Sequence, residues 1–194
     1  MSSISSHCTK CGAAFSAEVP QSVNVATDPE LKEKVRSGEL FTWTCPHCGT
    51  ANLLQIPFLY HDPDAHLMLV LSAAPLGAEG LQEGYTGRQV RSVGDLVEKI
   101  KIFDAGLDDL TVEMCKFVTC RELKKDVPLR FLRTDGADAE MTFAYPEKGE
   151  MQLVAVGFNV YEDCAAILQR NPHIRAAATG LAAIDQAWLS RYFQ

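Results

Sequence analysis

The sequence has little of what marks secreted, membrane-spanning or nucleic-acid-binding proteins. Residues 1–6 contain neither a basic segment nor an apolar stretch, so we expect no signal peptide there. The longest apolar run, 67–71, has the length of a strand and falls far short of the ~20 residues that cross a membrane. The formal net charge is −7. A general nucleic-acid binder or a protein that docks on anionic lipid needs a basic face, so both classes are disfavoured.

Seven cysteines are present, and their spacing separates them into two groups. Four occur as two close pairs, and three are scattered singly. In a chain without a secretion signal, this usage favours metal binding over disulfides. We therefore expect a cytoplasmic protein that carries a metal.

The two close pairs are copies of one short motif, Cys8-Thr9-Lys10-Cys11-Gly12 and Cys45-Pro46-His47-Cys48-Gly49. A gap of two residues lets one tight turn direct both sulfurs of a pair to one ion, and the following glycine tolerates positive φ. Four soft sulfur ligands suit tetrahedral Zn²⁺. The alternatives are two redox-active dithiols or cysteines that merely pack. We predict a zinc ion bound by Cys8, Cys11, Cys45 and Cys48.

A site with four cysteine ligands is closed, because no coordination position is left for water or substrate. Zinc is therefore expected to stabilise the fold and not to catalyse a reaction. The 33 residues between Cys11 and Cys45 exceed the usual spacing of roughly 12 to 20. A folded insert that leaves and returns at the same place accounts for the difference.

The first half is expected to form a small β-sheet with one inserted helix, as in a zinc ribbon. Asp28 and Pro29 are typical of a helix start and Gly38 of a helix end. Asp62-Pro63-Asp64 favours a turn inside a hairpin over 58–71. The remaining expectations are a polar lead-in over 2–7 and strands over 13–19, 22–25, 39–44 and 51–57. This domain is assigned to residues 1–75.

The second half is expected to be a separate α+β domain over 89–194, after a glycine-rich linker or loop over 76–88. Apolar spacing predicts two helices, then three antiparallel strands, then two helices. The helices are expected over 93–103, 108–124, 159–170 and 179–193, and the strands over 129–133, 141–145 and 151–158. The order of elements indicates an α+β fold and not a doubly wound sheet.

Three other groups of candidate site residues also have a structural interpretation. The group His61, Asp62, Asp64 and His66 could form a second metal or acid–base site, or a polar turn. His7 and His47 lie beside ligands and could support or replace a cysteine. Small buried side chains explain the three single cysteines, which are Cys115, Cys120 and Cys164.

Two surface features also have a functional and a structural interpretation. The basic series Arg88, Arg91, Lys99, Lys101 and the basic residues within 121–125 could contact nucleic acid, but solvated helix surfaces explain them more simply. The apolar residues Trp188, Tyr192 and Phe193 could form an interface, although core packing of the last helix is favoured.

The pattern of Gly38-Glu39-Leu40-Phe41, then Cys45-Pro46-His47-Cys48-Gly49, then Leu59-Tyr60-His61-Asp62-Pro63 resembles the bacterial CpXC-domain family. Leu107-Asp108-Asp109 after the first long helix adds to the resemblance, which covers residues 6–123. The family is named for two C-P-x-C motifs, and Thr9 replaces the proline of the first motif here. The resemblance implies the metal site and the fold class, and it brings no established activity.

No nucleophile–base pair, phosphate loop or carboxylate dyad stands out in the sequence. We therefore expect an interaction or scaffold protein with a structural zinc ion, acting with a protein partner or a second copy of itself, and we lean against an enzyme. One alternative is a zinc-ribbon regulator that contacts nucleic acid. Another is an enzyme with an unrecognised site in the C-terminal domain or between the domains.

Overall fold

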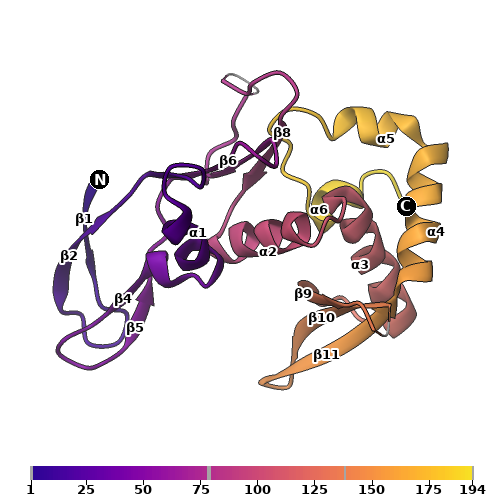
Figure 1. Cartoon of the computed structure of the whole chain (residues 1–194). Helices are drawn as coiled ribbons and strands as arrows, with labels where there is room; N and C mark the ends of the chain where they lie inside the picture. Colours follow the sequence, from indigo (N-terminus) through magenta and orange to yellow (C-terminus); the bar gives the residue numbers. More distant parts are fainter. Residues whose placement is uncertain (1, 78–79, 138, 194) are drawn as a thin grey trace. The chain divides into compact units, whose positions relative to one another are not determined.

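The computed structural model of the chain describes residues 2–77, 80–137 and 139–193, which form two compact units, Met1–Val97 and Glu98–Gln194 (Figure 1). Both units contain helices and small sheets, so the predicted α+β fold class is confirmed. The segment 76–88, expected to be a glycine-rich linker or loop, falls within the range of the first unit. Among the described residues, no helix has the length and apolar character needed to cross a membrane.

Two β-hairpins open the first unit and carry the cysteine motifs. Strand β1 (Ser2–His7) pairs antiparallel with β2 (Ala14–Val19), and β4 (Thr42–Thr44) pairs antiparallel with β5 (Ala51–Leu53). The prediction of a polar lead-in over 2–7 was wrong. Four of the six residues of β1 are serines, so the apolar alternation that indicates a strand is absent. The strand forms because the first cysteine turn folds this segment back so that it pairs with β2.

The first unit also contains a four-stranded sheet in the order β3-β6-β7-β8. The strands are β3 (Ser22–Asn24), β6 (Phe58–Asp62), β7 (Leu67–Leu71) and β8 (Thr86–Val90). The predicted hairpin is confirmed as β6–β7, whereas β3 pairs with β6 and β8 with β7 in parallel. Strand β8 was not predicted, because its residues Thr-Gly-Arg-Gln-Val follow a glycine-rich segment and lack apolar alternation.

The segment inserted between the two hairpins contains the expected helix α1 (Pro29–Arg36), which is followed by Gly38 at φ 79°. The predicted strand over 39–44 was wrong in its first half, which is the 3₁₀ turn η1 (Glu39–Phe41). Phe41 is fully buried there and packs edge-to-face on Phe58 of the sheet. The stabilisation gained by burying the Phe41 side chain outweighs the preference of the alternating sequence for an extended strand.

Helix α2 (Val93–Asp104) begins where the sequence predicted, and the hydroxyl of Ser92 accepts a hydrogen bond from the Asp95 N–H at 3.1 Å. In the second unit, the cap residue Asp108 precedes α3 (Asp109–Leu123). The three expected strands form one antiparallel sheet in the order β11-β10-β9, followed by α4. These elements are β9 (Arg130–Asp135), β10 (Glu140–Glu147), β11 (Glu150–Gly157) and α4 (Phe158–Arg170).

The last part of the chain differs from its prediction, since no continuous helix spans 179–193. Helix α5 (Pro172–Ala177) begins at a proline that was expected only to end α4, and α6 is a single turn (Gln186–Leu189). Gly180 at φ 69° interrupts the chain between them. Ile184, Trp188 and Leu189 are nevertheless buried in the core. Their apolar spacing reflects a loop folded onto the core and not one long helix.

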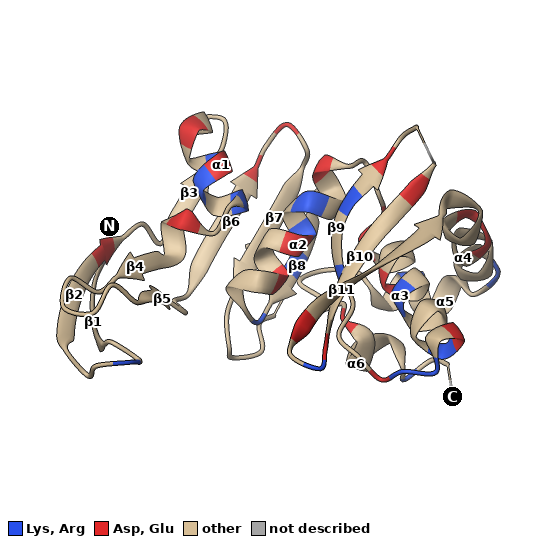
Figure 2. Cartoon of the chain, turned by 90° about the horizontal axis from the view of Figure 1, so that it is seen from below, with Lys and Arg blue, Asp and Glu red and all other residues tan. Residues whose placement is uncertain are grey.

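The core of the second unit also contains a network of buried charges. Lys99 donates to Asp109 at 2.8 Å, and Lys116 contacts Glu98 at 2.5 Å and Glu113 at 2.9 Å. All five residues are at most 7% exposed. The prediction that Lys99 belongs to a solvated helix surface was therefore wrong. Arg88, at 7% exposed, was wrongly placed on the surface too. In Figure 2, both basic and acidic segments are visible on α2.

Candidate metal centre

The two cysteine motifs form loops with the same backbone hydrogen bonds. In the first loop, the Cys8 N–H donates to the Ala13 carbonyl and the Gly12 N–H to the Cys8 carbonyl, both at 2.9 Å. The second loop repeats this pattern from Cys45 to Thr50 with the same distances. Gly12 and Gly49 have φ of 72° and 68°, so the glycine of each motif fills the left-handed position that the sequence indicated.

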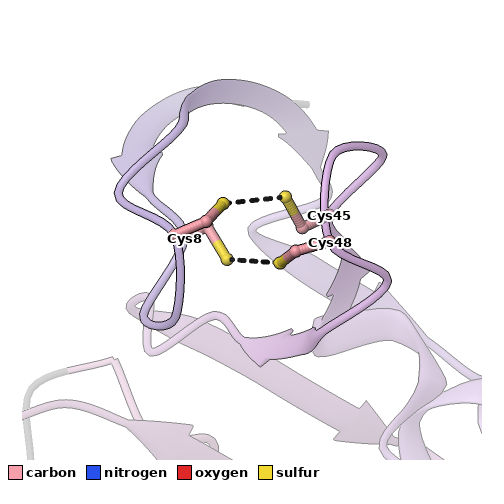
Figure 3. A group of neighbouring side chains, drawn as sticks. Cys8, Cys45 and Cys48 are labelled. Atoms are coloured by element: carbon pink, nitrogen blue, oxygen red, sulfur yellow. Dashed lines mark hydrogen bonds between the residues drawn. The ribbon is translucent and has the colours of Figure 1, made fainter.

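The loops bring the four sulfurs together. All four Sγ atoms lie within 4.8 Å of one another, and the closest pairs are Cys8–Cys48 at 3.5 Å and Cys11–Cys45 at 3.6 Å. Figure 3 shows sulfurs of the two loops facing each other. Four sulfurs at a Zn–S distance of about 2.3 Å would be separated by roughly 3.8 Å. The closest pairs are therefore near the spacing of a tetrahedral site, and four cysteines this close could hold a metal ion.

The sulfurs do not form disulfides, and all seven cysteines of the chain are free. Cys8 and Cys45 are buried, Cys48 is half-buried and Cys11 is exposed. An ion held by the four sulfurs would therefore lie near the surface, on the side of Cys11. A redox dithiol would require the two sulfurs of one motif to pair, whereas the closest contacts here join sulfurs of different motifs.

Asn52 connects the two loops and was missed by sequence analysis. Its Oδ1 accepts from the N–H of Thr9 at 2.8 Å and from the Thr9 hydroxyl at 2.9 Å. Its Nδ2 donates to the Thr50 carbonyl at 2.9 Å and lies 3.6 Å from Sγ of Cys8. The side chain is only 4% exposed. An asparagine three residues after the second motif gave no sequence signal, because its partner Thr9 is distant in the chain.

A second contact joins the hairpins outside the sulfur cluster. The rings of Phe15 on β2 and Trp43 on β4 are stacked, with centroids 3.7 Å apart and planes at 10°. His7 and His47, which were considered as supporting residues, are exposed, and neither belongs to the sulfur cluster. The aromatic pair and Asn52 therefore join the two hairpins.

Backbone N–H groups affect the cysteine pKa values. The hydrogen bond from the Cys11 N–H lowers the pKa of Cys8 to about 6, against the opposing effect of burial. The Thr50 hydroxyl lowers the pKa of Cys48. The Ala13 N–H acts in the same direction on Cys11, but burial and the neighbouring sulfurs outweigh it and raise that pKa to about 12. A cation bound at the centre would offset the repulsion among the thiolates and release the remaining protons.

The group His61, Asp62, Asp64 and His66 is not brought together as a metal site. Among the described residues, only the four cysteines form a group of three or more potential ligands that could share an ion. Asp62 pairs with Lys32 at 3.2 Å, and its Oδ1 accepts from the Ala65 N–H at 3.1 Å. Both histidine rings lie against Tyr85. Of the two interpretations given for this group, the contacts fit the polar turn and not a metal site.

The three single cysteines lie in the second unit. Cys115 and Cys164 are at most 1% exposed and are part of its hydrophobic core. Cys120 is half-buried, with its sulfur 3.4 Å from the Val127 carbonyl. The residues Trp188, Tyr192 and Phe193 also pack on this core, as was favoured over an interface.

The fold and the sulfur cluster define an α+β protein with a two-loop cysteine centre that could hold a metal ion. A family model described as CpXC protein matches residues 6–116, which is more than half of the chain. The chain therefore belongs to the CpXC family, as the sequence motifs indicated. The match includes both cysteine motifs, the four-stranded sheet, α2 and the first part of α3. No curated protein and no solved structure matches the chain significantly.

Proposed function

We propose that Cys8, Cys11, Cys45 and Cys48 bind one zinc ion whose role is structural. The observation that supports this most directly is the mutual approach of the four sulfurs within 4.8 Å. Thiolate ligands in this arrangement favour Zn²⁺ over cations that prefer oxygen ligands, such as Mg²⁺ or Ca²⁺. The four ligands complete the coordination, so the ion stabilises the two hairpins and does not activate water.

Zinc would contribute to folding because the two hairpins have little core of their own. Strands β4 and β5 have three residues each, and the side chains of residues 3–7 in β1 are exposed or half-buried. Comparable small sites gain about 10–16 kcal/mol from zinc at neutral pH, and this binding free energy becomes folding free energy. The hairpins are therefore expected to depend on the ion for a defined structure.

We further propose that the protein acts as an interaction or scaffold module and not as a metalloenzyme. A four-sulfur centre has no position for a substrate, so its effect on function is to hold a surface in place. The folded hairpins then present exposed side chains such as Leu53, which is 53% exposed.

Metal analysis of the protein purified without added zinc tests the proposal. We expect one zinc ion per chain, and we expect cobalt substitution to give the visible absorption of tetrahedral sulfur coordination. Cys45→Ser should lose most of the zinc, whereas Cys120→Ser, a control outside the cluster, should retain it. Protein without stoichiometric metal, or Cys45→Ser with full zinc content and native stability, would contradict the proposal.

A further inference from the structure

The sheet of the second unit has two edge strands that are treated differently. At β9, the Glu98 carboxylate accepts from the Phe131 N–H at 2.6 Å and from Arg130 at 3.1 Å. This edge is therefore covered by a charged side chain, one of the usual protections against pairing with another chain. Strand β11 forms the other edge of the sheet. Its residues 151–157 contain no charge and no proline.

Beyond Glu150 at its start, the exposed side chains of β11 are apolar. Four large hydrophobic residues of the described chain are exposed, and two of them, Met151 at 61% and Leu153 at 59%, lie on β11. Ala155 is exposed as well. Because side chains alternate along a strand, these three residues share one face. A long edge strand with an uncharged stretch and exposed apolar side chains, as over residues 151–157, favours pairing with a further strand.

The hydrogen-bond pattern shows which backbone groups of β11 are available. The Phe158 N–H donates to the Ala139 carbonyl at 2.9 Å, which makes 139 and 158 a hydrogen-bonded pair. Alternation along the antiparallel ladder then directs the backbone groups of residues 152, 154 and 156 toward β10. The N–H and C=O groups of 151, 153, 155 and 157 point away from the sheet. The residues with exposed apolar side chains therefore also carry the outward backbone groups.

We propose that two copies of this chain associate through antiparallel pairing of their β11 strands. With the two-fold axis at Val154, Met151 of one copy lies opposite Gly157 of the other, and Leu153 lies opposite Ala155. Four pairs form, and each exchanges two backbone hydrogen bonds, which gives about eight in all. Each large side chain faces a small one, so the shared apolar face has no crowding. The two three-stranded sheets become one of six strands.

Charge and area are consistent with a second copy as the partner. Glu150 is the only charged residue of β11, and antiparallel pairing places the two copies of it at opposite ends, roughly 25 Å apart. Screening is nearly complete at that separation. The contact of one strand pair is small compared with the ~1,600 Å² of a standard interface, so we expect a dimer that dissociates in the micromolar range. This inference is independent of the metal centre.

Sedimentation under reducing conditions tests the dimer. We expect wild-type protein to shift from monomer to dimer with concentration, and Leu153→Lys to weaken the dimer at least tenfold. Leu76→Lys is the matched control, because it places the same charge at an exposed leucine outside both β11 and the cysteine hairpins. A wild-type chain that stays monomeric at several hundred micromolar would overturn the proposal. So would equal effects of the two lysine variants.

Amide hydrogen exchange of the unmodified protein tests the register without any substitution. The amides of 151, 153, 155 and 157 should exchange fast in dilute solution and slow down as the concentration rises. The amides of 152, 154 and 156 should be protected at all concentrations. Dimerisation without added protection at the four outward amides would show that another surface forms the contact.

Discussion

Asn52 makes hydrogen bonds that connect the two cysteine loops. It satisfies two donors of Thr9 and approaches the sulfur of Cys8 at 3.6 Å. Residues that orient metal ligands typically contribute 10–100-fold to metal affinity. We expect Asn52→Ala to release the metal to a chelator at least about tenfold faster, and we expect the exposed Asn159→Ala to leave the release rate unchanged. A chromogenic chelator measures both rates; equal rates would show that Asn52 does not position the ligands.

Lys116 is the residue whose removal should destabilise the second unit most. Its ammonium contacts Glu98 and Glu113 and is 3% exposed. Breaking a buried ion pair leaves an unpaired charge and costs about 3–5 kcal/mol. We expect Lys116→Met to lower the free energy of unfolding by that amount in urea denaturation. Lys125→Met, which breaks the one-third exposed pair with Glu147, should change it little. Comparable stabilities of the two variants would contradict the buried network.

The same network predicts a pH window for stability. Burial by itself raises the pKa of Glu113, but Lys116 and Lys99 outweigh it and leave that pKa lowered. Burial by itself lowers the pKa of Lys116, but Glu113 and Glu98 outweigh it and leave that pKa raised. The Glu113 contribution is complete above its unfolded pKa and is lost in acid. The Lys116 contribution is complete below its unfolded pKa and is lost in strong alkali.

Urea unfolding measured against pH should show a plateau of stability between these limits. In Lys116→Met, the loss of stability at high pH should shrink.

At the scale of elements, the cysteine loops depend on a backbone conformation that glycine adopts readily. Gly49 has φ 68°, and no atom lies within 4 Å of a Cβ added there. Gly49→Ala therefore introduces no clash, and its cost is the left-handed conformation itself, about 1–2 kcal/mol. We expect zinc affinity to fall about tenfold in competition with a chelator, since 1.4 kcal/mol is a factor of ten. Gly136→Ala, in open space without positive φ, should have no effect.

The elements also show where sequence reasoning succeeds. The hairpin β6–β7, the helices α2 and α3 and the strands β9 to β11 were predicted because local apolar periodicity and turn residues agree with burial there. Strands β1 and β8 were missed because their own residues are polar or glycine-rich and their partners determine them. The helix expected over 179–193 was wrong because apolar residues packed on a core can recur at helical spacing without a helix.

At the scale of the whole molecule, each unit contains one of the two tryptophans, Trp43 and Trp188. Trp43 stacks on Phe15 beside the cysteine centre, whereas Trp188 packs in the core of the second unit. We expect chelation of the metal to change the fluorescence of a variant that retains only Trp43. A variant that retains only Trp188 should keep its emission. A response of Trp188 equal to that of Trp43 would contradict a metal contribution confined to the hairpins.

The sequence by itself was enough to predict that the four cysteines form one group, that a glycine with positive φ follows each pair, and that the chain belongs to its family. Two-residue spacing and positive φ are local properties of a short turn. It also determined the fold class through the order of periodic segments. Only the tertiary structure decided that Asn52 connects the two cysteine loops, that Lys99 and Lys116 are buried, and that β11 is an edge strand of its sheet. These properties depend on residues that are distant in the chain, and local patterns carry no information about which of them meet.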